Sequence, residues 1–418
     1  MTFTDRIGQE ILFFDGSMGA LMQSRGLPAG ESPVDWNITR PERVIEIHRE
    51  YLDAGADIIS TNTFTAYESA NREKIIDAAF KNARAAAVSK PNSLIAFDMG
   101  PTGRLLSPMG DLSFEECYNG YKEMASQASA LGADLVIIET MTDLLEMKAA
   151  ILAAKSTGLP VVCSMTFNEN GRTVMGTDPY CFTSMAQALG VSALGANCGV
   201  GPDALLKILP MFLECAAVPL VAQPNAGMPE TVDGKARYKL LPGEFADTMR
   251  KMAKKGVKLI GGCCGTTPAH IKAAVQACAG IKNKLNHGQK FEWLSSASRA
   301  IRFKNGKTEF GYIGTDYFGD FDALANEAFD LEDDGAEVIN LIIDGASLPK
   351  AVGYLQELSL KMPLSVQTSD PEAAEAAFRI YRGRPMMNIT GLDPETSRQM
   401  KTIAERYGAL IYEYNNRH

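Results

Sequence analysis

The sequence predicts a (β/α)8 barrel followed by a smaller, incomplete α/β domain. Short apolar runs alternate with amphipathic stretches of helical length, and eight such pairs fill about the first 280 residues. Chemically unusual residues follow these runs, where the active sites of such barrels lie. A chain of 418 residues also exceeds one ordinary domain. We expect the barrel in residues 1–282, a linker in 283–300 and the second domain in 301–418.

The predicted barrel strands are short apolar runs that end in polar residues or glycine. They span residues 10–15, 56–61, 93–97, 134–139, 160–166, 193–197, 218–223 and 257–262. Helical patterns between them include residues 113–131, 142–156, 201–213 and 242–255, and Ser113 begins a capping box. The alternative is a doubly wound open sheet. It is less favoured because no Gly-x-Gly-x-x-Gly segment follows the first strand.

Charge and composition exclude several classes of function. The formal net charge is −9 and the pI is near 5.2, which argues against nucleic acid or an anionic membrane as a partner. No apolar stretch approaches the roughly 20 residues of a membrane span. The first residues, MTFTDRIGQEILFFDG, lack the basic-then-apolar pattern of a signal peptide. We therefore expect a cytoplasmic protein.

The chain contains eight cysteines, which without an export signal are expected to be free, buried or metal-bound. Five of them lie inside apolar helical or strand patterns and are expected to be small core residues: Cys117, Cys163, Cys181, Cys215 and Cys278. Cys198, Cys263 and Cys264 differ, because they follow the sixth and eighth predicted strands.

Cys263 and Cys264 lie on a glycine-rich turn, residues 261–267 (GGCCGTT). Adjacent cysteines rarely bridge each other because the small disulfide ring is strained, and the glycines let both sulfurs face one point. In a closed barrel one strand separates strands six and eight, so Cys198 can join the pair. Three thiolates with an open fourth position are typical of catalytic zinc. On spacing alone, three buried thiols near a packed turn remain the alternative.

These cysteines belong to a set of segments that resembles the homocysteine-binding domain of the homocysteine S-methyltransferases, as in cobalamin-dependent methionine synthase and betaine–homocysteine methyltransferase. The segments are residues 14–19 (FDGSMG), 56–64 (ADIISTNTF), 197–198 (NC), 223–227 (QPNAG) and 261–266 (GGCCGT). The resemblance covers roughly residues 5–282. It implies that Cys198, Cys263 and Cys264 bind zinc and that the homocysteine sulfur is the fourth ligand. It also implies that Asn225 is a replaceable oxygen ligand when substrate is absent.

Zinc explains how a thiol becomes a nucleophile at neutral pH. A free alkyl thiol has a pKa of about 8.5 and is mostly protonated, whereas zinc binding removes the proton. Four thiolates around one zinc ion leave excess negative charge, which keeps the bound substrate sulfur reactive. We therefore predict methylation of homocysteine to methionine by in-line attack on an activated methyl group.

Five residues are expected to bind the substrate: Asp15, Gly16, Ser17, Asn62 and Glu139. Glu139 ends an otherwise apolar strand, where an unpaired carboxylate is costly. The resemblance implies that Glu139 holds the substrate ammonium group, and a salt bridge within the barrel is the alternative. Asp15 and Gly16 resemble the family's contacts to the amino-acid end of the substrate, with a plain turn as the alternative.

Residues 301–418 are too short for a second closed eightfold barrel. The predicted strands are residues 311–314, 337–342, 363–367, 385–389 and 408–412, separated by four helical patterns. The segment faintly resembles the front half of the folate-binding barrel of methionine synthase. However, residues 314–317 (GTDY) replace its Gly-Glu-Arg-x-Asn segment, and Asn340 and Gln367 stand near its two acidic pterin contacts. We therefore expect no binding of methyltetrahydrofolate.

The sequence contains no recognisable cobalamin- or adenosylmethionine-binding motif. The expected methyl donor is therefore a small molecule or a methylated corrinoid on a separate protein. A sheet without closing strands leaves an apolar face, which predicts a homodimer through residues 301–418 or docking of that corrinoid protein. The alternative function is a non-catalytic zinc-containing scaffold or sensor for a corrinoid or folate protein. The complete set of three cysteines, Asp15 and Glu139 favours the enzyme.

Overall fold

The computed structural model describes all of the chain except residues 29, 233–234, 283–290, 315–319, 359 and 415–418. The chain divides into two compact units. Unit 1 comprises Met1–Met175 and Val191–His287, and unit 2 comprises Gly176–Gly190 and Gly288–His418. Within the described residues, no helix has the length and apolar character needed to cross a membrane.

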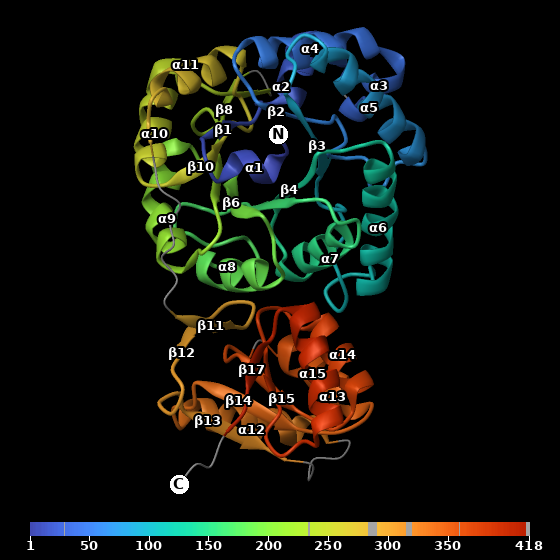
Figure 1. Ribbon diagram of the computed structural model, residues 1–418, viewed down its shortest axis with the longest axis vertical. Coiled ribbons are helices and arrows are strands. Elements are labelled where there is room, and N and C mark those ends of the chain that lie inside the picture. Colours follow the sequence, from blue (N-terminus) through green and yellow to red (C-terminus); the bar gives the residue numbers. More distant parts are fainter. Residues whose placement is uncertain (29, 233–234, 283–290, 315–319, 359, 415–418) are drawn as a thin grey trace. The chain divides into compact units, whose positions relative to one another are not determined.

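Unit 1 is built on a closed barrel of parallel strands (Figure 1). The strand order is β1-β10-β7-β6-β5-β4-β3-β2, and a parallel bridge between Phe14 and Ile58 joins the two ends of this sheet. The strands are β1 (Leu12–Phe13), β2 (Ile58–Ser60), β3 (Leu94–Met99), β4 (Leu135–Met141), β5 (Val161–Met165), β6 (Ala193–Asn197), β7 (Leu220–Gln223) and β10 (Val257–Ile260). The predicted barrel is confirmed, and the open-sheet alternative is wrong.

At least one helix follows each strand of the barrel along the chain. These helices are α2 (Met18–Ser24), α3 (Trp36–Thr39), α4 (Pro41–Asp53), α5 (Arg72–Ala87), α6 (Phe114–Ala130), α7 (Leu144–Lys155), α8 (Pro179–Ala188), α9 (Pro202–Cys215), α10 (Pro242–Lys254) and α11 (Pro268–Cys278). Ser113 and Glu116 form the predicted capping box, because each side chain accepts a hydrogen bond from the other residue's backbone N–H. Helix α6 therefore begins where its sequence signal indicates.

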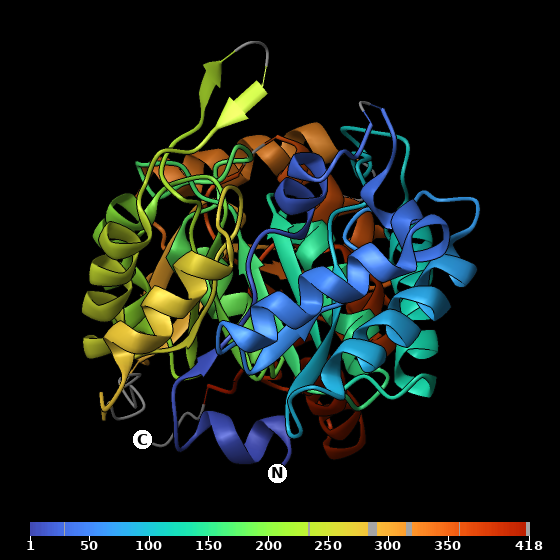
Figure 2. The ribbon, with the colours of Figure 1, turned by 90° about the horizontal axis from the view of Figure 1, so that it is seen from above.

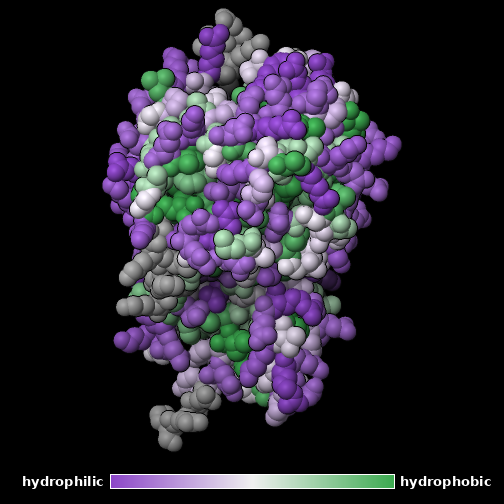
Figure 3. Space-filling model, turned by 45° about the horizontal axis from the view of Figure 1, so that its top comes forward, coloured by the Kyte–Doolittle hydropathy of each residue, from purple (hydrophilic) through white to green (hydrophobic). Residues whose placement is uncertain are grey.

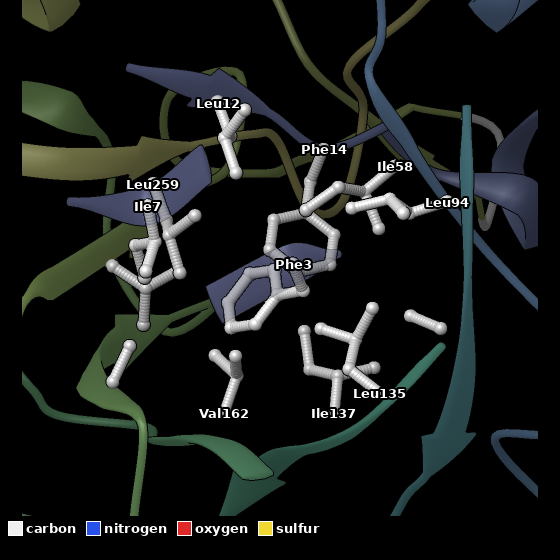
Figure 4. Close-up of a cluster of buried hydrophobic side chains, with 13 residues drawn as sticks. Phe3, Ile7, Leu12, Phe14, Ile58, Leu94, Leu135, Ile137, Val162 and Leu259 are labelled. Carbon is white, nitrogen blue, oxygen red and sulfur yellow. The ribbon is translucent and has the colours of Figure 1, made fainter. Parts of the chain in front are cut away.

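Helix α1 (Phe3–Ile7) fills the amino-terminal end of the barrel. Phe3 and Ile7 are buried in a hydrophobic cluster that receives a side chain from every barrel strand, including Leu12, Ile137 and Leu259 (Figure 4). Several of these side chains come from the first residues of their strands. The opposite, carboxyl-terminal end of the barrel, called the mouth below, is therefore the end available for chemistry.

Unit 2 contains a five-stranded parallel sheet in the order β13-β14-β15-β16-β17. Its strands are β13 (Phe310–Ile313), β14 (Val338–Ile342), β15 (Leu364–Gln367), β16 (Met386–Asn388) and β17 (Leu410–Tyr412), and its further helices are α12 (Phe321–Asp333), α13 (Ser347–Glu357), α14 (Pro371–Ile380) and α15 (Pro394–Tyr407). The strands fall where the sequence predicts them. Of the GTDY segment that departs from the folate-barrel pattern, residues 315–317 lie outside the described residues.

An antiparallel hairpin, β11 (Glu292–Ser295) and β12 (Ala300–Phe303), precedes this sheet. The predicted linker 283–300 is therefore wrong for residues 292–295, while residues 283–290 lie outside the described part. Helix α8 belongs to unit 2 with this hairpin: Ser184 Oγ and Ser295 Oγ are 2.7 Å apart, and the rings of Tyr180 and Trp293 stack at 5.3 Å. No strand is predicted here because the apolar residues of β11 lie in a mainly polar segment.

The hairpin packs against part of one face of the unit 2 sheet. Side chains from both form one hydrophobic cluster: Leu294, Ile301, Val338 and Met386. Phe310 on one edge strand stacks on Tyr412 of the other at 5.4 Å, and Phe303 contacts both rings. The apolar face that motivated the homodimer prediction is therefore covered in part, Tyr312 of β13 is still 57% exposed, and the homodimer stays a prediction. On the side shown in Figure 3, hydrophobic residues form small patches separated by hydrophilic ones.

Candidate metal and substrate site

Cys198, Cys263 and Cys264, called the thiol cluster below, meet at the mouth of the barrel. Cys198 follows β6, the pair follows β10, and β7 lies between these strands. The three Sγ atoms lie within 4.8 Å of one another, and those of Cys198 and Cys264 are 3.8 Å apart. A tetrahedral zinc ion with Zn–S bonds of about 2.3 Å separates its sulfur ligands by about 3.8 Å. The thiol cluster therefore fits one zinc ion.

The other five cysteines are buried, as predicted.

The segment that leaves β7, residues 223–226, fixes the backbone of all three cysteines. Its carbonyl groups accept hydrogen bonds from the N–H groups of Cys198 at 3.0 Å and Cys263 at 2.9 Å. An N–H group of the same segment donates to the Cys264 carbonyl at 2.9 Å. Cys198 has a φ of 55°, a left-handed conformation that is uncommon for residues other than glycine. Its neighbours therefore hold it in place, which is typical of a functional site.

Asn225 lies in this segment, between the residues that bond to Cys263 and Cys264. Its side chain is 4% exposed, and Oδ1 has no hydrogen-bond partner among the described residues. An unpaired buried oxygen costs about 1–3 kcal/mol, and oxygen is a ligand that zinc accepts. This is consistent with the predicted role of Asn225 as a replaceable ligand.

Tyr238 is a site residue that the sequence analysis missed. It follows the hairpin β8 (Glu230–Val232) and β9 (Lys235–Arg237), which extends from the barrel (Figure 2). Hydrogen bonds from the thiols of Cys198 and Cys263, and one from Tyr238, lower the pKa of Cys264 to about 3. Gly265 has a φ of 78°, and a Cβ there would lie 2.2 Å from Tyr238 Cγ, so glycine is required for this packing.

Three carboxylates near the carboxyl-terminal ends of β1, β3 and β4 form the acid cluster: Asp15, Asp98 and Glu139. Burial, together with the nearby charges of Asp15 and Cys264, raises the pKa of Glu139 to about 8. Burial raises the pKa of Asp15 to about 7, although hydrogen bonds from Ser60 oppose the shift. No cation contributes to these shifts among the described residues. The internal salt bridge considered for Glu139 is thus not observed there, and the acid cluster can receive an ammonium group.

Asp98 is the second residue that the sequence analysis missed. It is 6% exposed, and its Oδ1 has no hydrogen-bond partner among the described residues. Burial, with Glu139 and Asp15 nearby, raises its pKa well above the ordinary value. The available signal was an aspartate directly after the apolar run 93–97, at the predicted end of a strand.

The remaining predicted substrate residues have structural partners. A Cβ on Gly16 would lie 2.6 Å from Thr266 Oγ1, so this close approach requires glycine. Ser17 donates its N–H to the same Thr266 oxygen at 3.2 Å, and its Oγ caps α2. Asn62 Nδ2 donates to the Pro33 carbonyl at 2.8 Å. The side chains of Ser17 and Asn62 therefore hold loops at the mouth, and their contacts to substrate remain predictions.

The fold and the site define a (β/α)8-barrel protein with an open cluster of three thiols. Residues 12–278 match the family model for homocysteine S-methyltransferase, so the chain belongs to this family. The family prediction, and with it the methyltransferase class, is confirmed.

Individual relatives agree with this assignment. The methionine synthases of Mycobacterium tuberculosis (strain ATCC 25618 / H37Rv) and Mycobacterium leprae (strain TN) are 28% and 29% identical over 97% of this chain, which spans 38% of the length of each. Solved structures of the homocysteine methyltransferase MmuM from Escherichia coli also match. Its apo form is 25% identical with a TM-score of 0.54, covering 66% of this chain and 98% of MmuM. Its metallated form is 24% identical with the same TM-score, covering 64% and 96%.

Proposed function

We propose that this chain binds zinc through the thiol cluster and methylates the sulfur of homocysteine to give methionine. The observation that supports this most directly is the geometry of the cluster, three sulfurs at zinc-site spacing. The segment that bonds to all three cysteines carries Asn225, whose buried Oδ1 has no partner among the described residues. Three fixed ligands and one replaceable ligand leave a position for a substrate sulfur. A structural zinc site has four fixed ligands instead.

The protein's own groups then orient the substrate. Zinc, when bound, supplies the Lewis acidity that keeps the substrate sulfur deprotonated at neutral pH. Glu139 binds the substrate ammonium group, and Asp98 adds a second carboxylate to the same region. Gly16 allows the loop after β1 to approach closely, so that its backbone N–H groups reach the substrate carboxylate. Holding both ends of the amino acid fixes the sulfur for in-line attack.

For the methyl donor, the proposal is a methylated corrinoid on a separate protein, or a small molecule. The zinc-loaded chain is incubated with homocysteine and methylcobalamin, betaine, S-methylmethionine or methyltetrahydrofolate, and methionine is measured. We expect methionine from at least one of the first three donors and none from methyltetrahydrofolate. Binding of zinc and homocysteine without methionine from any donor, even with a methylated corrinoid protein, would favour the scaffold or sensor instead.

A further inference from the structure

Strand β4 (Leu135–Met141) is irregular at Glu139 and Thr140. The register between β4 and β5 shifts between Ile138 and Met141, and Thr140 has a φ of 63°. Such a left-handed conformation is strongly disfavoured for a β-branched residue and persists only where neighbours impose it. Bulges of this kind re-aim side chains at the ends of strands. The backbone that orients the Glu139 carboxylate thus depends on the conformation of Thr140.

Asn197, the last residue of β6, holds this bulge at two points. Its Oδ1 accepts a hydrogen bond from the Thr140 N–H at 2.8 Å, and its Nδ2 donates to Thr140 Oγ1 at 2.7 Å. Ser164 Oγ on the intervening strand β5 donates to the same Oδ1 at 2.8 Å. Asn197 is 1% exposed, so water does not compete for these bonds. Together they offset the cost of the left-handed Thr140.

The same amide adjoins the thiol cluster. Asn197 directly precedes Cys198, and its Nδ2 lies 4.0 Å from Cys263 Sγ. Its carbonyl oxygen accepts a hydrogen bond from Thr166 Oγ1 at 3.1 Å, which fixes the end of β6. One rigid side chain therefore contacts both the bulge behind Glu139 and a thiol of the predicted zinc site.

We propose that Asn197 is a positioning residue that sets the separation between the Glu139 carboxylate and the thiol cluster, and thereby selects the chain length of the amino-acid thiol. This inference rests on the proposed function. A thiol bound at both its sulfur and its ammonium group must span a fixed distance, and homocysteine exceeds cysteine by one methylene. If the bulge relaxes, Glu139 moves relative to the sulfurs and this discrimination falls.

The test compares four forms of the zinc-loaded chain: wild type, N197A, T140G and the double variant N197A/T140G. Calorimetry measures the affinity for homocysteine and for cysteine, and metal analysis measures zinc. We expect N197A to bind homocysteine about tenfold or more weakly, with a smaller preference over cysteine and unchanged zinc. Glycine adopts a positive φ without steric cost, so T140G should restore much of the affinity lost in N197A, and the double variant should bind homocysteine as T140G does.

A second variant changes the Thr140 side chain, the other partner in the same hydrogen bond. T140V keeps the β-branched side chain but removes the Oγ1 acceptor, so it should weaken homocysteine binding several-fold even if N197A does not fold. Wild-type affinity and selectivity in N197A or T140V would overturn the inference, as would a loss in N197A that T140G does not reduce. A wild-type chain that binds zinc but no homocysteine would overturn the proposed function itself, and this inference with it.

Discussion

Polar side chains stand at the carboxyl-terminal ends of the parallel strands in both units, but their bonding differs. In unit 2, Asn340 Nδ2 and Asn388 Nδ2 both donate to Gln367 Oε1 at 3.1 Å. Ser365 Oγ donates to Asn340 Oδ1 at 2.6 Å, and Gln367 Nε2 donates to the Thr390 carbonyl at 3.2 Å. These groups satisfy one another without a ligand.

The barrel shows the opposite arrangement. Asp98 Oδ1, Gln223 Oε1 and Asn225 Oδ1 are buried and have no hydrogen-bond partner among the described residues. Buried polar groups are nearly always paired in folded proteins, so unpaired ones at strand ends indicate an absent partner. Polar residues at strand ends therefore do not by themselves indicate a ligand-binding site. At the ends of the parallel strands, buried oxygens without a partner among the described residues distinguish the mouth of the barrel from the unit 2 sheet.

The largest effect is expected from Cys263→Ser. Removing one thiolate from the thiol cluster should abolish zinc binding and methyl transfer, because zinc affinity depends on the full set of soft ligands. The core cluster around Phe3 contains none of these residues, so far-UV circular dichroism should be unchanged. Cys278→Ala, at a buried thiol outside the site, is the matched control and should keep one zinc per chain. An equal zinc content in C263S and wild type would contradict the proposal that Cys263 is a zinc ligand.

Glu139→Ala should weaken homocysteine binding by about 1.5–3 kcal/mol, the scale of a charge-assisted hydrogen bond. Zinc content should stay the same, because Glu139 is not part of the thiol cluster. Calorimetry on the zinc-loaded variant measures the change. Unaltered homocysteine affinity would mean that the acid cluster does not receive the ammonium group.

Asn388→Ala tests whether the polar network of unit 2 contributes to stability and not to substrate binding. The variant removes a donor to Gln367 and leaves polar groups of the buried network unpaired, which should lower the free energy of unfolding by about 1–3 kcal/mol. Homocysteine affinity should not change. Denaturant unfolding and calorimetry measure the two quantities. A loss of homocysteine binding with intact stability would show that the comparison between the units is wrong.

The smallest effect concerns pH. The pKa of Glu139 is about 8 in the folded chain, above its ordinary value of 4.5, so ionisation of this carboxyl costs stability. The cost grows as pH rises from about 4.5 towards 8, in the window between the unfolded and folded values. Without homocysteine, Glu139→Gln should therefore gain about 2–4 °C in melting temperature over wild type at pH 8 and little at pH 5. A constant difference at both values would contradict the raised pKa.

Much of the fold was predictable because its signals are local. Apolar runs with helical spacers predicted the barrel strands and the five strands of unit 2, and the Cys263–Cys264 turn with Cys198 predicted the thiol cluster. Asp98 had such a local signal at a predicted strand end, whereas Tyr238 and the role of Asn197 were not predictable in this way. These two depend on contacts between residues far apart in the sequence, such as the two hydrogen bonds between Asn197 and Thr140. The packing of the hairpin on the unit 2 sheet likewise depends on contacts between residues that are far apart in the sequence.

The most direct test of the central claim is X-ray absorption at the zinc edge during a homocysteine titration. Without homocysteine we expect three sulfur neighbours at about 2.3 Å and one lighter ligand, consistent with an oxygen from Asn225 or water. With saturating homocysteine we expect four sulfur neighbours and loss of the lighter ligand. A spectrum that keeps three sulfurs at saturation, or a purified chain that binds no zinc, would contradict the proposal that the thiol cluster activates the homocysteine sulfur.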